Sequence, residues 1–405
     1  MDPGPIVGEL VAGSGKADPY PLYEQLHALG PVAKVADGFY VANGYREVSA
    51  TLRNPAFGKW DVQFEPGPEL ERHSSIITLN RSILDANPPH HTRVRRLMSA
   101  VFTPRRTAAL APAVAKTTDE LLDAMAALGS DGGAIDFMDQ FAFRIPVTVI
   151  CELLGVPEAD RYRFRGLAHD LGIALEMVND PAMLIPADAA TDELRDYFTA
   201  LVAARRAEPR DDLTSALVHQ ADEQDGTLSE EELLSNLVLL LFAGFETTTN
   251  LFGNGLAVLF DRPRVAEGLR AGTVPVHDFV EEVLRYDSPV QLTSRLVMAE
   301  GLEVGGLPVV RGSEVLLLLG AANRDPARFA EPHRFDPARP DNQPLSFGAG
   351  GHFCLGAALA RLEAATAFPL LLKRFPKLAP AGGAEPVRAD RLVLRGYRTL
   401  PVTVG

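Results

Sequence analysis

Apolar side chains recur at helical spacing over several stretches of the chain. The stretches end at breaks that contain Pro or Gly, which is typical of helices joined by turns. The pattern predicts helices near residues 22–29, 94–102, 110–128, 145–154, 194–202 and 213–218. Strand-like runs are fewer and fall near residues 31–42, 292–315 and 395–404. We therefore expect a mainly α fold with small β-sheets.

The clearest predicted helix follows Ser229, in the sequence SEEELLSNLVLLLFAGFETTTNLFGNGLAVLF. Ser229 and Glu232 have the spacing of a capping box, and the pattern continues to Phe260, where DRP stops it. Some thirty residues span ~45 Å, enough to cross the whole protein. Residues 237–245 are apolar on every face, which predicts burial on all sides. A membrane span is disfavoured, because the run is too short and its flank is acidic.

The middle of this helix carries the polar sequence AGFETTTN. Glu246 and the threonines 247–249 stand where a core helix favours Leu or Ala. Threonine hydroxyls can bond to carbonyls one turn earlier and bend a helix, and the small pair Ala243 and Gly244 leaves room beside such a bend. Two interpretations follow: a satisfied polar patch in a large core, or a groove for a small ligand with an acid and an alcohol beside it.

Composition narrows the class of protein. Hydrophobic residues make up 46% of the 405 residues, so a large core can form, and no repeat or low-complexity linker divides the chain. We expect one domain over residues 1–405. The net charge of −14 argues against nucleic-acid binding, and no stretch predicts a secretion signal or a membrane span. With two cysteines far apart, no disulfide framework is expected, which favours the cytoplasm.

The second cysteine, Cys354, lies in FGAGGHFCLG, just before a strongly helical run. Unpaired N–H groups and the dipole of a helix N-terminus favour a thiolate. The glycines at 348, 350 and 351 permit a tight turn and close approach to a large flat ligand. A lone cysteine disfavours structural zinc, whereas haem iron with one thiolate ligand fits. A buried inert thiol is the alternative for Cys354, and it is the interpretation we adopt for Cys151.

The loop resembles the haem-binding loop of the cytochrome P450 family, F-G-x-G-x-H-x-C-x-G, matched from Phe347 to Gly356. The resemblance extends over most of the chain. EEVLR contains the E-x-x-R pair, EPHRF resembles the segment that completes its ion network, and AGFETT resembles the oxygen-activation stretch. The order and spacing of these motifs are similar to those of soluble bacterial members. The resemblance implies the P450 fold, with haem b between the long central helix and the helix after Cys354.

The resemblance also implies roles for individual residues. Cys354 would ligate the iron, Thr247 would hydrogen-bond reduced dioxygen, and Glu246, in place of a more usual aspartate, would relay protons. The other implied residues are His91, Arg95, Arg295, Phe347, His352 and Gly356 for haem binding; Leu239, Phe242, Ala243, Val290, Leu292 and Thr293, with residues 75–84, for substrate; and Glu282, Arg285 and Arg334 for a structural ion network. Residues 169–194 would form a mobile lid. Taken singly, several of these charged residues are equally compatible with a solvated surface.

The implied activity is insertion of one atom of O2 into a hydrophobic substrate, such as a polyketide, macrolide, terpenoid or aromatic intermediate of secondary metabolism. No phosphate loop or dinucleotide motif is present, so electrons must come from another protein, a ferredoxin with its reductase. Arg93, Arg96 and Arg361 are candidate docking contacts, and we expect a monomer. Two other classes stay open: a haem enzyme that uses peroxide, couples phenols or isomerises, and a helper protein that has lost catalysis.

Overall fold

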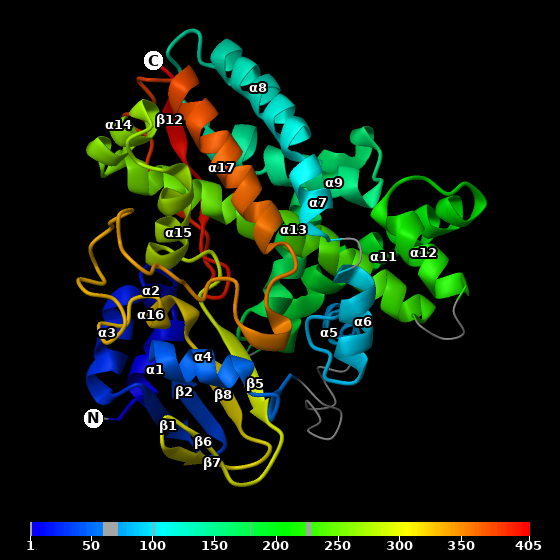
Figure 1. The fold of residues 1–405 in the computed structure, drawn as a ribbon, viewed down its shortest axis with the longest axis vertical. Coiled ribbons are helices and arrows are strands. Elements are labelled where there is room, and N and C mark those ends of the chain that lie inside the picture. The colour runs from blue at the N-terminus through cyan, green and yellow to red at the C-terminus, as the bar shows by residue number, and fades with distance from the viewer. Residues whose placement is uncertain (1, 60–71, 100–101, 179, 224–227) are drawn as a thin grey trace.

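The computed structural model describes residues 2–59, 72–99, 102–178, 180–223 and 228–405. It is mainly helical, as predicted, and its strands form small sheets. Figure 1 shows the helices around the central α13, with the largest sheet at one side. The helices are α1 (Gly4–Val11), α2 (Gly13–Ala17), α3 (Tyr20–Leu29), α4 (Tyr45–Arg53), α5 (Ser74–Asn80), α6 (His90–Ser99), α7 (Pro104–Ala109), α8 (Ala111–Leu128), α9 (Arg144–Leu154), α10 (Phe164–Leu171), α11 (Ile185–Ala207), α12 (Leu213–Glu223), α13 (Glu230–Phe260), α14 (Pro263–Ala271), α15 (Val276–Tyr286), α16 (Leu319–Ala322) and α17 (Ala357–Arg374).

Short helical turns and strands connect these helices. The turns are η2 (Met138–Ala142), η3 (Glu158–Arg163), η4 (Gly172–Leu175), η5 (Pro181–Leu184) and η6 (Gly350–His352). The strands are β1 (Val32–Ala36), β2 (Phe39–Ala42), β3 (Phe57–Gly58), β4 (Ile135–Asp136), β5 (Thr293–Val297), β6 (Leu302–Val304), β7 (Leu307–Val309), β8 (Glu314–Leu317), β9 (Ala379–Pro380), β10 (Val387–Arg388), β11 (Tyr397–Thr399) and β12 (Pro401–Thr403). The three predicted strand regions therefore all contain strands.

The largest sheet joins distant parts of the chain, in the order β1-β2-β8-β5-β3. Only the β2–β8 pair is parallel, with Val41 opposite Leu316; its other pairs are antiparallel. In the antiparallel β5–β8 pair, Arg295 lies opposite Val315. This pairing places β5, which carries Thr293 and Arg295, inside the sheet rather than at its edge. The two residues are therefore held on a rigid element.

Helix α13 begins and ends as predicted. The Glu232 backbone N–H donates to the Ser229 hydroxyl and the Ser229 N–H donates to the Glu232 carboxylate, which completes the capping box. The helix lies across the molecule and contacts α9, α11, α15 and α17 (Figure 1). Gly244 permits close packing with α9, because a Cβ there would overlap the side chain of Ile150. Within the described residues, no helix is long and apolar enough to span a membrane.

Buried apolar residues form three clusters around this framework. The first joins α13 to α5, α6, α9, α10 and α11, and the second joins its C-terminal half to α8, α15 and α17. The third lies at the largest sheet. Cys151, on α9, is fully buried in the first cluster, and burial raises its pKa to about 12. The thiol of Cys151 is therefore protonated and inert, as expected.

Candidate active site between the central helix and the Cys354 loop

Cys354 lies at the N-terminus of α17, where the sequence predicted it. The residue as a whole is accessible to solvent, although the surrounding protein partly desolvates its sulfur atom. Burial raises the pKa of the thiol, whereas the backbone N–H groups of Gly356 and Ala357 and the positive charges of Arg95 and Arg361 lower it. Without a bound cation, Cys354 therefore favours the protonated thiol over the thiolate, in contrast to what its position at a helix N-terminus predicted. The N–H groups nevertheless aim positive dipoles at the sulfur, which suits a thiolate once a cation binds it.

Backbone geometry explains the glycines of the Cys354 loop. Gly348 has a φ of 69° and its N–H donates to the Leu345 carbonyl, which closes a tight turn. Gly350 has a φ of 70°, and a Cβ there would overlap the carbonyl of Leu52 at the end of α4. The Cys354 N–H then donates to the Phe347 carbonyl at 3.0 Å. The glycine at position 350 therefore permits close packing against α4.

A group of basic side chains lies beside this loop, and we call it the basic cluster: His91, Arg95, Arg295, His352 and Lys59. The ring centroids of His91 and His352 are 4.1 Å apart. Burial lowers the pKa of His352 to about 2, with further lowering by His91 and Arg295. Burial also lowers the pKa of His91 and Lys59, and that of Arg295 to about 10. The four basic residues predicted to bind haem, His91, Arg95, Arg295 and His352, thus lie together in the structure. Lys59 also lies there, although no sequence motif had predicted it.

The basic cluster has few anionic partners of its own. Lys59 pairs with Asp85 at 3.3 Å, whereas Arg95 donates to the neutral carbonyl of Phe353 and Arg295 to that of Ser294. The buried Nε2 of His91 has no hydrogen-bond partner among the described residues. Buried polar atoms normally have partners. The arrangement therefore suits an anionic group of a ligand.

The polar centre of α13 presents an accessible face. Residues 237–242 are buried, but Ala243 is exposed and Glu246 and Thr247 are partly exposed. The prediction of burial on all sides is therefore wrong at Ala243, because other elements cover only part of the helix surface there. The Thr247 hydroxyl donates to the Ala243 carbonyl at 3.2 Å, one turn earlier, as expected for threonine in a helix. Gly244 serves packing against α9 instead of widening a groove.

Glu246 faces positive charge from outside α13. Its Oε1 atom lies 3.8 Å from Nη1 of Arg391, a residue of the C-terminal loop, and Arg165 on α10 acts at longer range. Burial raises the pKa of Glu246, and both arginines oppose that change. A carboxyl whose pKa is raised binds a proton more readily than an ordinary exposed carboxyl, which suits a group that passes protons on.

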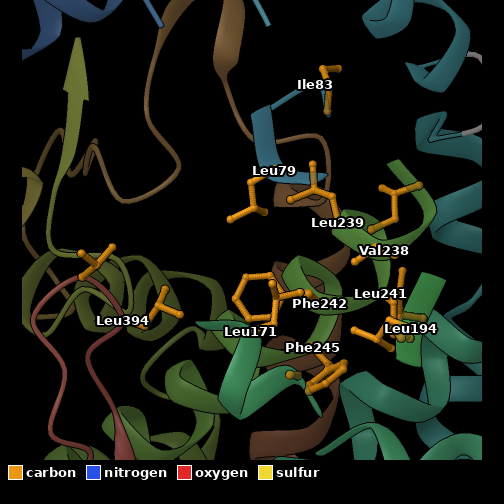
Figure 2. Packing of buried hydrophobic residues seen from close by; sticks show 14 of the residues in the cluster. Leu79, Ile83, Leu171, Leu194, Val238, Leu239, Leu241, Phe242, Phe245 and Leu394 are labelled. Atoms are coloured by element: carbon orange, nitrogen blue, oxygen red, sulfur yellow. The ribbon is translucent and has the colours of Figure 1, made fainter. Parts of the chain in front are cut away.

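The predicted substrate residues lie mainly in one apolar cluster. Leu239, Phe242 and Leu292 are buried there, with Val290 packed against them. Figure 2 shows Leu239 and Phe242 of α13 near Leu79 of α5, with Leu394 of the C-terminal loop at the left of the view. Thr293 has different surroundings: its hydroxyl lies 3.4 Å from Lys59 Nζ and Arg295 Nη1. Thr293 thus belongs with the basic cluster more than with the apolar surface.

The predicted pair Glu282 and Arg285 lies on α15. Both side chains are fully buried and form two hydrogen bonds of 2.7 Å. The prediction that Arg334 completes the network is wrong for its side chain, which is largely exposed and pairs with Glu331; only the Arg334 carbonyl accepts from Arg285. The guanidinium of Arg339 approaches Glu282 instead, at 3.6 Å. The Arg334 N–H donates to the Glu331 carbonyl in a turn, and the chain then directs the side chain of Arg334 outward and that of Arg339 inward.

Comparisons with known proteins identify the family of this chain. A family model described as "Cytochrome P450" matches residues 181–273 and 276–398. The chain belongs to the cytochrome P450 family. It is 40% identical to the cytochrome P450 monooxygenase PikC of Streptomyces venezuelae over 95% of this chain and 91% of the relative. It is 38% identical to the 6-deoxyerythronolide B hydroxylase of Saccharopolyspora erythraea, over 98% of both chains. The crystal structure of Mycobacterium smegmatis CYP164A2 superposes with a TM-score of 0.88 and 37% identity, covering 99% of this chain and 100% of that one.

The P450 family implies a haem-thiolate iron cofactor and an oxygenase activity. The residues of this P450 fit such a group. Cys354 offers a thiol at a helix N-terminus in a solvent-accessible residue, and the basic cluster offers buried cationic groups with an unpartnered His91 nitrogen for the carboxylates of haem. The protein is thus a P450 monooxygenase by family, with side chains suited to the family's cofactor.

The exposed arginines of this P450 differ from the predicted docking set. Arg93 pairs with Glu232 at 2.5 Å, and Arg361 makes two hydrogen bonds to Glu281. Arg96 is exposed, and no ion pair involving it occurs in the described part of the chain. Arg105 and Arg106 on the neighbouring α7 are also exposed, and α7 contacts α17. Arg96 and these two arginines are therefore better placed than Arg93 or Arg361 to meet an acidic partner.

Proposed function

We propose that this P450 inserts one oxygen atom from O2 into a bulky hydrophobic substrate, with haem b bound through the Cys354 thiolate. The observation that carries the proposal is the position of Cys354, a solvent-accessible residue just before α17, beside Arg95 of the basic cluster. Haem bound there supplies dioxygen binding and reductive activation, and a thiolate ligand favours O–O cleavage. His91, Arg95, Arg295 and His352 would hold its two carboxylates, and the neutral His91 can donate from its unpartnered nitrogen.

The roles proposed for α13 concern protons. The Thr247 hydroxyl, partly exposed and bound only weakly to the Ala243 carbonyl, can rotate to donate toward the reacting oxygen. Glu246 can pass a proton from solvent to the same region, because burial raises its pKa and its side chain remains partly accessible. Together they would deliver protons to the oxygen that leaves as water.

The substrate proposal depends on the apolar surface beside Ala243. Leu79, Leu239, Phe242 and Leu392 belong to the apolar cluster that contains this part of α13, and burial of apolar area contributes ~25 cal/mol per Å². A relative of similar length is named as the hydroxylase of 6-deoxyerythronolide B. We therefore propose hydroxylation or epoxidation of a polyketide or macrolide intermediate, in a cytoplasmic, monomeric enzyme that receives electrons from a ferredoxin and its reductase.

The first experiment is a titration of purified holoenzyme with candidate substrates, 6-deoxyerythronolide B among them, followed by optical difference spectra. Binding close to the iron should displace a water ligand and change the spin state. Turnover with a ferredoxin, its reductase and NADPH is then compared with turnover driven by hydrogen peroxide, and product is identified by mass spectrometry. Product only with peroxide would favour the peroxide-using class, and a bound substrate with no product under either regime would favour the helper class.

A further inference from the structure

Arg391 lies at a junction between the C-terminal loop, α13 and the segment that follows α10. Its side chain is almost fully buried, with 6% of its surface exposed, yet its Nη1 atom has no hydrogen-bond partner among the described residues. That atom lies 3.8 Å from Oε1 of Glu246. The other end of the guanidinium, Nη2, donates to the His169 carbonyl near the end of α10. The Arg391 side chain therefore connects Glu246 of α13 to residues 169–194, the segment predicted to form a lid.

Two further contacts show that the segment after α10 is built around this loop. Gly172, in η4, leaves space for the arginine, because a Cβ there would overlap the Arg391 guanidinium. The Glu176 carboxylate accepts hydrogen bonds from three consecutive backbone N–H groups of the C-terminal loop, at Leu392, Val393 and Leu394. The path of residues 169–176 thus fixes where the Arg391 side chain lies.

In the part of the chain that the structure describes, no other cation is as well placed to act on Glu246. Arg165, on α10, also influences the carboxyl, but its own guanidinium pairs with Asp139 and lies over the ring of Phe143. A buried charge without a close partner costs free energy, so the Glu246 carboxylate is expected to follow the position of Arg391. A carboxylate that lies 3.8 Å from a positive charge, without a hydrogen bond to it, can still rotate to accept a proton and, once protonated, to pass it on.

We propose that Arg391 is a positioning residue for Glu246: it holds the carboxylate where it can relay protons, and it makes that position depend on the seating of residues 169–176. The inference rests on the proposed proton role of Glu246. It assigns to a residue of the C-terminal loop a part in coupling oxygen reduction to product formation, although that residue does not touch the reacting atoms.

The test is a double-mutant cycle on the holoenzyme with Arg391→Gln, Glu246→Gln and the double variant. The measured quantity is product formed per NADPH oxidised, with hydrogen peroxide determined in parallel. Arg391→Gln should lower product per NADPH about fivefold, which equals ~1 kcal/mol at tenfold per 1.4 kcal/mol. In the Glu246→Gln background, the same substitution should have no further effect, because Arg391 acts through the carboxylate. An additive loss would overturn the inference and assign Arg391 to packing alone.

Three further variants separate positioning from folding. Arg391→Lys keeps the charge and should restore at least half of the coupling, whereas Gly172→Ala keeps Arg391 but displaces its guanidinium and should uncouple the enzyme. Arg163→Gln removes a surface arginine that pairs with Glu193 and should change nothing. Normal coupling in Gly172→Ala, in protein with wild-type haem content, would count against the inference.

The pH dependence of turnover distinguishes the two roles, because a purely structural role of Arg391 would not change it. Because Arg391 and Arg165 both oppose the rise in the pKa of Glu246, loss of Arg391 should move the acidic limb of the turnover profile to higher pH. An unmoved limb would contradict positioning by charge. If Glu246→Gln by itself leaves coupling and pH profile unchanged, the proposed proton role fails; if only the Arg391 variants are silent, the further inference alone fails.

Discussion

Glu282 and Arg285 form a two-point ion pair in which neither side chain is exposed to solvent. The remaining guanidinium N–H groups donate to the carbonyls of Asn323, Pro332 and Arg334, so each of the five donors of Arg285 has an acceptor. The Glu282 carboxylate also accepts from the Asp336 backbone N–H. A buried charge pair of this kind ties α15 to the segment that leads into the Cys354 loop, and full satisfaction offsets much of its desolvation cost.

Removal of one partner should therefore be costly. Arg285→Met leaves the Glu282 carboxylate buried without its main partner, so the free energy of unfolding should fall by about 3–5 kcal/mol. Urea denaturation followed by circular dichroism measures the loss, with haem content as a second readout. Arg334→Met is the matched control: its side chain is largely exposed, so the change should stay within ~0.5 kcal/mol. Equal losses in both variants would restore Arg334 to the network.

Substitution of the proposed iron ligand should remove the thiolate spectrum. A thiolate ligand shifts the carbon monoxide band of reduced haem to longer wavelength, so purified protein should show that band and Cys354→Ser should lose it. Cys151→Ser, at the buried thiol of α9, is the control and should keep the band in whatever protein folds. Persistence of the band in Cys354→Ser would refute the assignment of the ligand.

The hydroxyl of Thr247 can be tested against an ordinary helical threonine. Thr247→Ala should keep haem, the carbon monoxide band and substrate binding, but product per NADPH should fall several-fold and hydrogen peroxide should rise. Thr199 on α11 makes the same bond to a carbonyl four residues earlier, at 2.8 Å, away from the site. Thr199→Ala should leave coupling unchanged and, because Thr199 is exposed, should change the free energy of unfolding by no more than ~0.5 kcal/mol. Unchanged coupling in Thr247→Ala would leave its hydroxyl a structural group.

Exposed arginines near the Cys354 loop should govern docking of an acidic ferredoxin. Arg96→Glu should slow turnover more at low salt than at high salt, because charge steering is screened over about 10 Å at 0.1 M ionic strength. Arg93→Glu should additionally reduce stability, since Arg93 forms a partly buried ion pair with Glu232. Arg270→Glu, on α14, makes the same change in net charge and controls for it. A loss that is equal at every ionic strength would argue against docking at Arg96.

Asp287 should make stability depend on pH at the acidic end. Burial alone would raise its pKa, but Arg388 and Arg395 outweigh burial and hold the pKa well below its usual range. The stabilisation is present above the ordinary aspartate pKa, about 4, and is lost as the pH falls toward the folded-state pKa. Asp287→Asn should therefore destabilise by about 3 kcal/mol at pH 7, and the difference from wild type should shrink below pH 4. Urea unfolding of wild type and Asp287→Asn, at pH 7 and at a pH below 4, measures this difference in stability. A difference that is the same at both pH values would contradict the pH dependence assigned to Asp287.

The sequence by itself determined the helix-rich class, the limits of α13 with its capping box at Ser229, and the position of Cys354 before α17. These features depend on local periodicity, helix capping and turn chemistry, which act over a few residues and are therefore visible in the order of the chain. Only the tertiary structure decided that Lys59 joins the basic cluster, that Arg339 rather than Arg334 approaches Glu282, and that Arg391 meets Glu246 from 145 positions away in the numbering (391 − 246). No local pattern marks such residues, because long flexible basic side chains acquire a partner only when distant segments pack together and bury them.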